Sequence, residues 1–191
     1  MALRDLVLSN RSTRAYDRSR KVTREEIVSL IDLARLSPSA NNRQPLRYYI
    51  ACDDESAAKV FSHTHWAGLL KGIKLPPEGK EPPAFIAIYV DKDICPNADA
   101  AGKDVGIAAQ TILLGAAELG LSGCMIGAFD RPGTQNDIGL PEKYELTLLI
   151  ALGRRDEDIR LTETDGPTAY YRGEDGTHYV PKLKMENILL N

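Results

Sequence analysis

The chain has 191 residues, of which 43% are hydrophobic and 27% are charged, with a formal net charge of -3. This composition is typical of a globular domain with a buried core and excludes a disordered chain. The charge balance and the lack of a long basic run argue against nucleic-acid binding, and no apolar run reaches the ~20 residues that a membrane helix needs.

The first half of the chain predicts three helices and one strand. Apolar residues on one side of 3–9 indicate a short helix. A capping box beginning at Thr23 opens a second helix, whose apolar positions recur at i, i+3, i+4 and i+7 and which Pro38 ends. Aromatic and β-branched residues predict a strand over 47–52, and a short helix is expected over 55–62.

The second half begins with a loop, because residues 75–83 include four prolines. The unbroken apolar run 84–90 predicts a buried strand, and 104–119 predicts a helix with a close-packing face of small residues. Two further strands are expected, over 124–129 and 146–152. The elements do not alternate as regular βαβ units, so we expect a single α+β domain over 1–191 with a mixed or antiparallel sheet.

Residues 160–191 form a polar extension that we expect to be irregular, apart from a short amphipathic helix near 183–190. Such a tail is difficult to bury on its own chain, so we expect it to wrap a partner subunit.

The three cysteines, Cys52, Cys95 and Cys124, are scattered and include no CxxC pair, which predicts neither a disulfide framework nor a zinc site. Cys124, on a predicted core strand, is expected to be a small buried hydrophobe. The first residues lack the pattern of a signal peptide, and we expect a cytoplasmic protein.

Three separated segments carry groups that suit a ligand. Arg11-Ser12-Thr13-Arg14 offers two guanidinium groups and two hydroxyls that could grip a phosphate, or it is a solvated turn. The stretch 37–45 presents Asn and Gln amides that match a flat heterocycle, or it is only a connector rich in turn residues. Near the end of the chain, Lys182 and Lys184 could close over an anion or face water.

Taken in order, these segments resemble the nitroreductase family, and the resemblance covers nearly the whole chain. Its most specific part is the Pro-Ser…Asn-x-Gln-Pro segment. The matching segments are Arg11-Ser12-Thr13-Arg14, Pro38-Ser39-Ala40-Asn41-Asn42-Arg43-Gln44-Pro45, Gly106-Ile107-Ala108-Ala109-Gln110, Gly120-Leu121-Ser122-Gly123 and Ala151-Leu152-Gly153.

The resemblance implies an α+β fold, an intertwined homodimer and two FMN sites at the subunit interface. It also implies an FMN-dependent oxidoreductase that accepts hydride from NAD(P)H and passes it, by a ping-pong mechanism, to nitroaromatic, quinone or similar acceptors. No catalytic side chain is implied, because the flavin N5 carries the hydride and the protein supplies position and electrostatics.

Carried over to this chain, the family's motif divides the FMN-binding residues into four sets. The set expected to bind the phosphate and the pyrimidine side of the ring is Arg11, Ser12 and Arg14. The set expected from the other subunit, lining the isoalloxazine, is Pro38, Ser39, Ala40 and Asn42, with Gln44 on the same loop. Backbone amides near N5 are expected from Ile126, Gly127 and Ala128. The basic pair that completes the phosphate pocket is Lys182 and Lys184.

Two positions depart from the family's pattern. Leu46 stands where the loop commonly continues with Trp, which is expected to change packing rather than chemistry. Asn10 stands where a basic residue is common before the Arg-Ser pair, which removes one charge from the expected phosphate grip and leaves open whether Asn10 contacts the cofactor.

The proline-rich segment 62–83 is expected to be a variable loop near the active site that sets substrate width. It carries His63, His65, Trp66, Lys71 and Lys74, whose roles the sequence leaves open. We interpret Trp66 as a core anchor rather than a stacking platform for substrate. A metal site at His63-Thr64-His65 is disfavoured because no third ligand or carboxylate partner is evident.

Other interpretations stay open. A specialised flavin enzyme of the same fold, such as a dehalogenase, a flavin-fragmenting enzyme or an azoline oxidase, would differ mainly in its acceptor loops. A flavin-binding protein without turnover and a helical scaffold without a cofactor are further alternatives. The physiological acceptor and the choice between NADH and NADPH are not encoded in any motif. Tyr170-Tyr171-Arg172 could meet the cofactor or a partner, but packing of an exposed tail is favoured.

Overall fold

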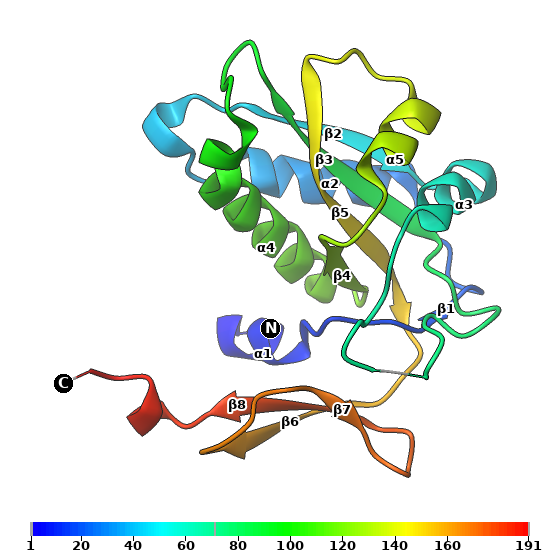
Figure 1. Cartoon of the computed structure of the whole chain (residues 1–191), viewed down its shortest axis with the longest axis vertical. Coiled ribbons are helices and arrows are strands. Elements are labelled where there is room, and N and C mark those ends of the chain that lie inside the picture. Colours follow the sequence, from blue (N-terminus) through cyan, green and yellow to red (C-terminus); the bar gives the residue numbers. More distant parts are fainter. Residues whose placement is uncertain (1, 71, 191) are drawn as a thin grey trace.

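The computed structural model describes residues 2–70 and 72–190 (Figure 1). Lys71, one of the loop residues singled out above, lies outside the described residues. A five-stranded antiparallel sheet runs through the molecule in the order β1-β5-β3-β2, and β4 also pairs with the long central strand β5. The strands are β1 (Tyr16–Asp17), β2 (Leu46–Ala51), β3 (Ala84–Asp91), β4 (Ser122–Ile126) and β5 (Tyr144–Arg155).

Helices cover both faces of this sheet (Figure 1). One face packs against α2 (Arg24–Arg35) and the long helix α4 (Gly102–Glu118). The other face packs against α3 (Asp54–Ser62) and is closed near α5 (Arg131–Ile138). The short helix α1 (Leu3–Ser9) lies beside α4. The predicted α+β class is confirmed, and the sheet is antiparallel.

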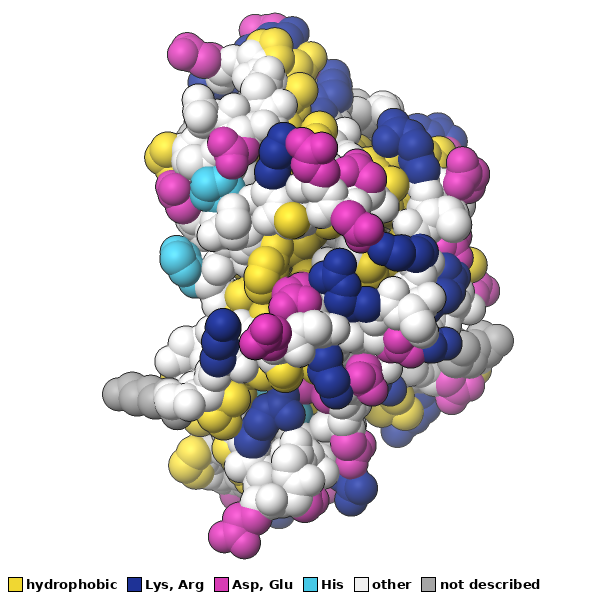
Figure 2. Space-filling view, turned by 90° about the vertical axis from the view of Figure 1, so that its right-hand side faces the viewer, with side chains coloured by type: hydrophobic (Ala, Val, Ile, Leu, Met, Phe, Trp, Pro, Cys, Tyr) yellow, Lys and Arg dark blue, Asp and Glu magenta, His cyan; other side chains and the backbone are white. Residues whose placement is uncertain are grey.

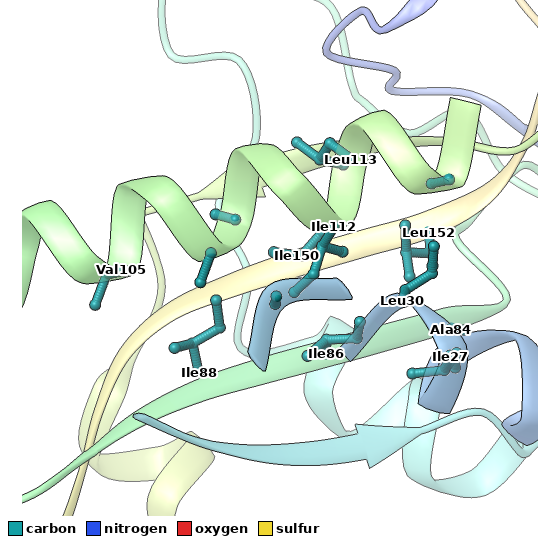
Figure 3. Packing of buried hydrophobic residues seen from close by; sticks show 14 of the residues in the cluster. Ile27, Leu30, Ala84, Ile86, Ile88, Val105, Ile112, Leu113, Ile150 and Leu152 are labelled. Atoms are coloured by element: carbon teal, nitrogen blue, oxygen red, sulfur yellow. The ribbon is translucent and has the colours of Figure 1, made fainter. Parts of the chain in front are cut away.

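The larger core lies between the sheet and the pair α2 and α4 (Figure 3). Ile86 and Ile88 of β3 point into this layer with Leu30 of α2 and Ile112 of α4, and each is at most 1% exposed. Side chains of a strand alternate between faces, so Phe85 of β3 enters the opposite core. Burial on both faces explains why β3 is apolar at almost every position.

Local signals place α2 correctly. The Thr23 hydroxyl accepts from the Glu26 amide at 3.2 Å, and the Glu26 carboxylate accepts from the Thr23 amide at 2.9 Å, which is the predicted capping box. Gly115 of α4 lies against α2, where an added Cβ would stand only 2.7 Å from Leu33 Cδ1. The glycine therefore sets how closely α2 and α4 approach.

The C-terminal extension differs from the prediction. Instead of an irregular tail, it forms a second, three-stranded sheet in the order β6-β8-β7 (Figure 1). Its strands are β6 (Ile159–Thr164), β7 (Tyr171–Arg172) and β8 (His178–Leu183). The helix expected near 183–190 is also wrong, because only the 3₁₀ turn Met185–Asn187 forms there. The strands β6 and β8 pair in parallel across a long connection. Most of their residues are exposed or half-buried, so they lack the apolar run by which a buried strand is predicted.

One face of the molecule mixes side chains of both signs. On the face seen in Figure 2, Lys and Arg side chains alternate with Asp and Glu, and hydrophobic side chains show between them. This face has no field of a single sign of the kind that binds nucleic acid. Within residues 2–70 and 72–190, no helix combines the length and the apolar character that crossing a bilayer requires.

Candidate functional site

The arginine segment is fixed by the end of the sheet. After α1 the chain runs past β4, where the Thr13 amide donates to the Gly123 carbonyl at 3.1 Å. Tyr16 is fully buried, and its hydroxyl donates back to the Thr13 carbonyl at 2.7 Å. Because Thr13 and Tyr16 are anchored in this way, the side chains on either side of Thr13 have defined positions.

These side chains open onto a cavity of about 340 Å³, which we call the arginine cavity and which lies between the segment 10–14, α4, β4 and β8. It is lined by four of the predicted phosphate-binding residues, which are Arg11, Ser12, Arg14 and Lys182. The structure therefore brings the segment 11–14 and Lys182 together. No carboxylate is among its lining residues, which are Asn10, Arg11, Ser12, Arg14, Gln110, Leu113, Gly123, Met125, Tyr170, His178, Val180 and Lys182. The cavity therefore has the electrostatics of an anion site.

Lys184 does not line this cavity. Its ammonium group forms an ion pair with Asp165, the residue that follows the end of β6. Lys182, by contrast, is exposed on β8 and has no ion pair among the described residues. The two lysines predicted to act together are therefore separated by their contacts.

Arg14 is held through both its backbone and its side chain. Its amide donates to the Glu157 carboxylate at 2.5 Å, and Nη1 donates to the Ser12 carbonyl at 3.2 Å. Nη1 also lies 3.3 Å from Nε2 of His178, and the guanidinium carbon lies 4.8 Å from the centre of the Tyr170 ring. Such stacking of a guanidinium on an aromatic ring limits its rotation.

Arg11 is held by the end of α1. Its Nε donates to the Asn10 carbonyl at 2.5 Å and its Nη2 to the Val7 carbonyl at 2.8 Å. Burial, and secondly the charge of Arg155, lower the pKa of the Arg11 guanidinium. Its ordinary value lies so far above neutrality that the group stays cationic.

Two residues at this site, His178 and Glu157, were missed by sequence reasoning, and Tyr170 was assigned the less relevant of two roles. His178 is 1% exposed, and burial, followed by the charge of Arg14, lowers the pKa of its imidazole. The side chain of Glu157 is 5% exposed and pairs with Arg172. Tyr170, expected to be exposed tail packing, lines the cavity instead. No local pattern marks His178 or Glu157, because both contact Arg14, which is more than 140 residues away in the sequence.

The second predicted segment is a tight turn after α2. Its 3₁₀ turn, Ala40–Asn42, includes two residues in the left-handed region, Asn41 and Asn42, both with φ of 52°, and Gln44 follows with φ of 51°. Asn tolerates this conformation, but Gln rarely adopts it. The Gln44 side chain donates to the Asn42 Oδ1 at 3.1 Å. Backbone strain of this kind is concentrated at functional sites.

A buried carboxylate from α4 holds this turn. Asp104 is 7% exposed and accepts from the Ser39 hydroxyl at 2.7 Å and from the Ala40 amide at 3.1 Å. The Ser39 oxygen in turn accepts from the Gln44 amide at 3.0 Å. Asp104 was not singled out from the sequence, since one aspartate at the start of a helix is an ordinary feature.

The turn borders a second cavity of about 560 Å³, which is separate from the arginine cavity. Pro38, Ser39 and Gln44 line the second cavity, whereas Ala40 and Asn42 line neither and are exposed. Within one chain, the 38–44 turn and the segment 11–14 therefore line different cavities.

The third predicted segment, Ile126-Gly127-Ala128, follows the end of β4. Ile126 is buried, while Gly127 and Ala128 are exposed. An added Cβ at Gly127 would meet nothing within 4 Å, so the backbone there faces open space. This segment does not line the arginine cavity.

The start of the variable loop is fastened beside this segment. The His65 amide donates to the Ala128 carbonyl at 2.9 Å. His63 does have carboxylate partners, contrary to expectation: Nε2 lies 2.8 Å from Asp137 and Nδ1 lies 3.7 Å from Asp130. Trp66 is half-buried, packs against the core and donates to the Thr64 hydroxyl at 2.7 Å, which are contacts that an anchor makes.

Cys124 is 5% exposed on β4, and burial raises the pKa of its thiol. It is thus the buried hydrophobe that was predicted.

Comparison with known proteins identifies the fold and the family. The profile of the nitroreductase family matches residues 7–154. YodC of Bacillus subtilis, a protein named as an NAD(P)H nitroreductase, is 24% identical over 177 residues, which cover 78% of this chain and 88% of that protein.

Solved structures agree. A nitroreductase family protein from Streptococcus pneumoniae superimposes with a TM-score of 0.72 at 17% identity, over 87% of this chain and 96% of that one. An FMN-dependent nitroreductase from Clostridium difficile superimposes with a TM-score of 0.64 at 26% identity, over 80% and 87%. The family profile spans most of the chain, so this chain belongs to the nitroreductase family.

Proposed function

We propose that the chain is an FMN-dependent oxidoreductase that takes hydride from NAD(P)H and reduces nitroaromatic, quinone or similar acceptors. Its family membership supports NAD(P)H oxidoreductase chemistry, and the Clostridium difficile structure is of an FMN-dependent relative. Which acceptor this chain uses stays a prediction.

The observation that carries this proposal is the donor set of the arginine cavity. Arg11 and Arg14 offer forked donors, Ser12 a hydroxyl and Lys182 an ammonium group, around a space of about 340 Å³. Forked guanidinium groups match phosphate oxygens and carbonyl edges, and a serine hydroxyl adds a short bond. The absence of any lining carboxylate removes the repulsion that a phosphate would otherwise meet. The residues present therefore fit FMN's phosphate and the polar edge of its ring.

When bound, FMN would supply the hydride chemistry, which no side chain of the chain can supply alone. Arg14 would place positive charge beside the pyrimidine side of the ring, where it favours the reduced, anionic cofactor. The amides of Gly127 and Ala128 would orient the N5 edge. Lys184 would join the phosphate grip only by leaving Asp165, so Lys182 carries that role in our proposal.

We further propose that the site is completed in a homodimer. Pro38, Ser39, Ala40, Asn42 and Gln44 lie outside the arginine cavity of their own chain, so a second copy is needed to bring them to the ring. The pair α2 and α4 exposes large apolar side chains that a second copy would cover. They include Leu33, Leu36 and Ile107, which are 41%, 66% and 40% exposed.

The C-terminal extension is a further part of this proposal. The second sheet exposes Leu161, Tyr171 and Leu183, and the residues after it expose Met185, Ile188, Leu189 and Leu190. We propose that the extension 160–191 reaches the partner subunit through these exposed apolar side chains.

The test starts from purified protein incubated with excess FMN and passed through gel filtration. We expect a yellow protein with about one FMN per chain, which NADPH or NADH reduces under anaerobic conditions within seconds to minutes and which an added quinone or nitroaromatic then reoxidises. A colourless protein would refute the proposed function and favour a scaffold without cofactor. A yellow protein whose flavin stays oxidised for hours would favour a passive binder. Reduction without reoxidation by either acceptor would favour a specialised enzyme of the same fold. The cytoplasmic location stays a prediction, to be checked by cell fractionation.

A further inference from the structure

His178 lies behind the arginine cavity, at the start of β8. Its side chain is almost fully buried, its ring centre is 5.2 Å from that of Tyr170, and its backbone amide donates to the Asp158 carbonyl at 2.9 Å. Its Nε2 faces Nη1 of Arg14 at 3.3 Å. This imidazole is thus fixed by the second sheet and directed at the guanidinium of the cavity.

The chemistry of the two groups determines where the imidazole proton lies. A guanidinium only donates hydrogen bonds, so Nε2 has to accept, which puts the single proton of a neutral ring on Nδ1. Nδ1 is buried and has no hydrogen-bond partner among the described residues. An unsatisfied buried donor of this kind is costly and rare in native structures. The fold tolerates that cost, and the contact with Arg14 is the one polar interaction of the ring that the described residues provide.

The surrounding charges favour the neutral ring. The groups that face His178 are the guanidinium groups of Arg14 and Arg172, against the single carboxylate of Glu157. That carboxylate is already engaged by the Arg14 amide and by Arg172. A positively charged imidazole would therefore be a third cation beside Arg14 and Arg172, with Glu157 as their shared anion.

We propose that His178 is a positioning residue of the cofactor site, a neutral imidazole that accepts from Arg14 and thereby directs its guanidinium into the cavity. This inference rests on the proposed function, because it assigns Arg14 to the FMN site. It gives the C-terminal sheet a role in its own chain: β8 supplies the contact that orients an arginine located more than 160 residues earlier.

The test compares two replacements of His178. His178→Gln keeps an amide oxygen near the position of Nε2, whereas His178→Leu keeps a similar volume without an acceptor. Thermal unfolding first establishes that both variants fold. We expect His178→Leu to weaken FMN binding about 10-fold or more, and His178→Gln to stay within about 3-fold of wild type, from the loss or retention of one charge-assisted hydrogen bond. Tyr179→Phe, on the neighbouring position of β8, serves as the control and should leave FMN binding unchanged.

The same replacement in the Arg14→Ala background decides whether His178 acts through Arg14. If it does, His178→Leu should change FMN affinity there by less than about 2-fold, because the interaction it removes is already absent. Equal losses in both backgrounds, or a Gln variant as weak as the Leu variant, would overturn the positioning role while leaving FMN binding by the wild type intact. Failure of the wild type to bind FMN would refute the proposed function instead.

A measurement without cofactor tests the proton position directly. The chain has only 3 histidines, so their ring nitrogens can be assigned by ¹⁵N NMR with single substitutions. At pH 7.5 we expect His178 to be the neutral tautomer with its proton on Nδ1. A proton on Nε2, or a doubly protonated ring, would overturn the proposal, because neither form accepts a hydrogen bond from Arg14.

Discussion

Ser39 and Asp104 join the turn after α2 to the first turns of α4: the Ser39 hydroxyl donates to the buried Asp104 carboxylate across 2.7 Å. The same carboxylate accepts from the Ala40 amide at 3.1 Å. One aspartate therefore fixes both the side chain and the backbone of a turn whose next residues, Asn41 and Asn42, have positive φ. The other backbone contact of Ala40 lies within the turn itself, where its carbonyl accepts from the Arg43 amide at 3.1 Å, so Asp104 is what ties the turn to α4.

Asp104→Ala should therefore destabilise the protein. Two hydrogen bonds to a buried charged group are lost, and we expect the free energy of unfolding to fall by about 2–3 kcal/mol. Urea unfolding monitored by circular dichroism measures it. Asp99→Ala is the matched control, since Asp99 is exposed on the preceding turn and should change stability by less than about 0.5 kcal/mol. Equal effects of the two substitutions would show that Asp104 does not fix the turn.

Arg14→Ala should weaken FMN binding and lower the reduction potential of the bound flavin. The variant removes the cation expected beside the pyrimidine side of the ring, and loss of a charge-assisted hydrogen bond corresponds to about 10- to 100-fold in affinity. Fluorescence titration and a redox dye titration measure the two quantities. Arg4→Ala, an exposed arginine of α1, is the control. An Arg14→Ala protein with unchanged affinity and potential would remove Arg14 from the site.

Tyr89 offers a prediction on pH. Its side chain is fully buried in the core between the sheet and α3, its hydroxyl has no partner among the described residues, and burial raises its pKa to about 12. An unfolded tyrosine ionises near pH 10, so between pH 10 and 12 the unfolded chain loses a proton that the folded chain retains. The stability associated with the neutral phenol is thus complete below pH 10 and is lost as the pH rises toward 12.

Tyr89→Phe should remove both effects. At pH 7 we expect the variant to be equal to wild type or more stable by about 1 kcal/mol, because an unsatisfied hydroxyl leaves the core. Above pH 10 the advantage of the variant should grow, since phenylalanine does not titrate. Urea unfolding at pH 7, 9.5 and 11 measures the difference between the two proteins. A variant that is clearly less stable at pH 7 would mean that the Tyr89 hydroxyl has a partner.

The elements that could be predicted from the sequence are those whose signals are local. The capping box at Thr23 and the apolar run of β3 each lie within one short window, and both elements formed where expected. The strand expected over 124–129 begins two residues earlier, at Ser122, because its start is set by pairing with Gly153 of β5. Pairing across 31 residues leaves no trace in a local pattern.

The difference between local and long-range signals also explains which site residues could be predicted from the sequence. The segment 11–14 and Lys182 were identified by residue type and by family resemblance, and the structure brings them to one cavity. Glu157 and His178 escaped notice because each is a single polar residue whose burial depends on a second sheet that the sequence did not predict. Lys184 looked equivalent to Lys182, but Asp165 engages it. A charged residue's partner, more than its own type, decides what it is free to bind.

His63 is predicted to fasten the start of the variable loop. Its ring lies between Asp137 and Asp130, and its carbonyl accepts from the Asp130 amide at 2.8 Å. His63→Ala should speed hydrogen exchange at the amides of His65 and Asp130 by about 5- to 30-fold, equivalent to about 1–2 kcal/mol of local stability. His65→Ala, whose exposed side chain has no hydrogen bond among the described residues, is the control. Unchanged exchange in the His63 variant would show that backbone contacts alone hold the loop.

The most demanding prediction concerns the interface. Ile107 is 40% exposed on α4, on the helix pair that we propose a second copy covers. Glutamate at that position would have to bury a charge against the partner, which costs several kcal/mol, so Ile107→Glu should weaken dimerisation by about 100-fold or more. Leu140→Glu introduces the same charge at a residue that is 37% exposed on the α5–β5 connection and should leave the dimer intact. Light scattering after gel filtration measures the mass.

FMN binding by the Ile107→Glu monomer separates the two parts of the proposal. If the 38–44 turn of a second copy lines the ring, the monomer keeps the arginine cavity but loses one wall, and its FMN affinity should fall together with the dimer. A folded monomer that binds FMN as tightly as wild type would place the whole cofactor site within one chain. A variant that remains dimeric with full FMN would instead move the interface away from α4, and the exposed apolar residues of α2 and α4 would need another explanation.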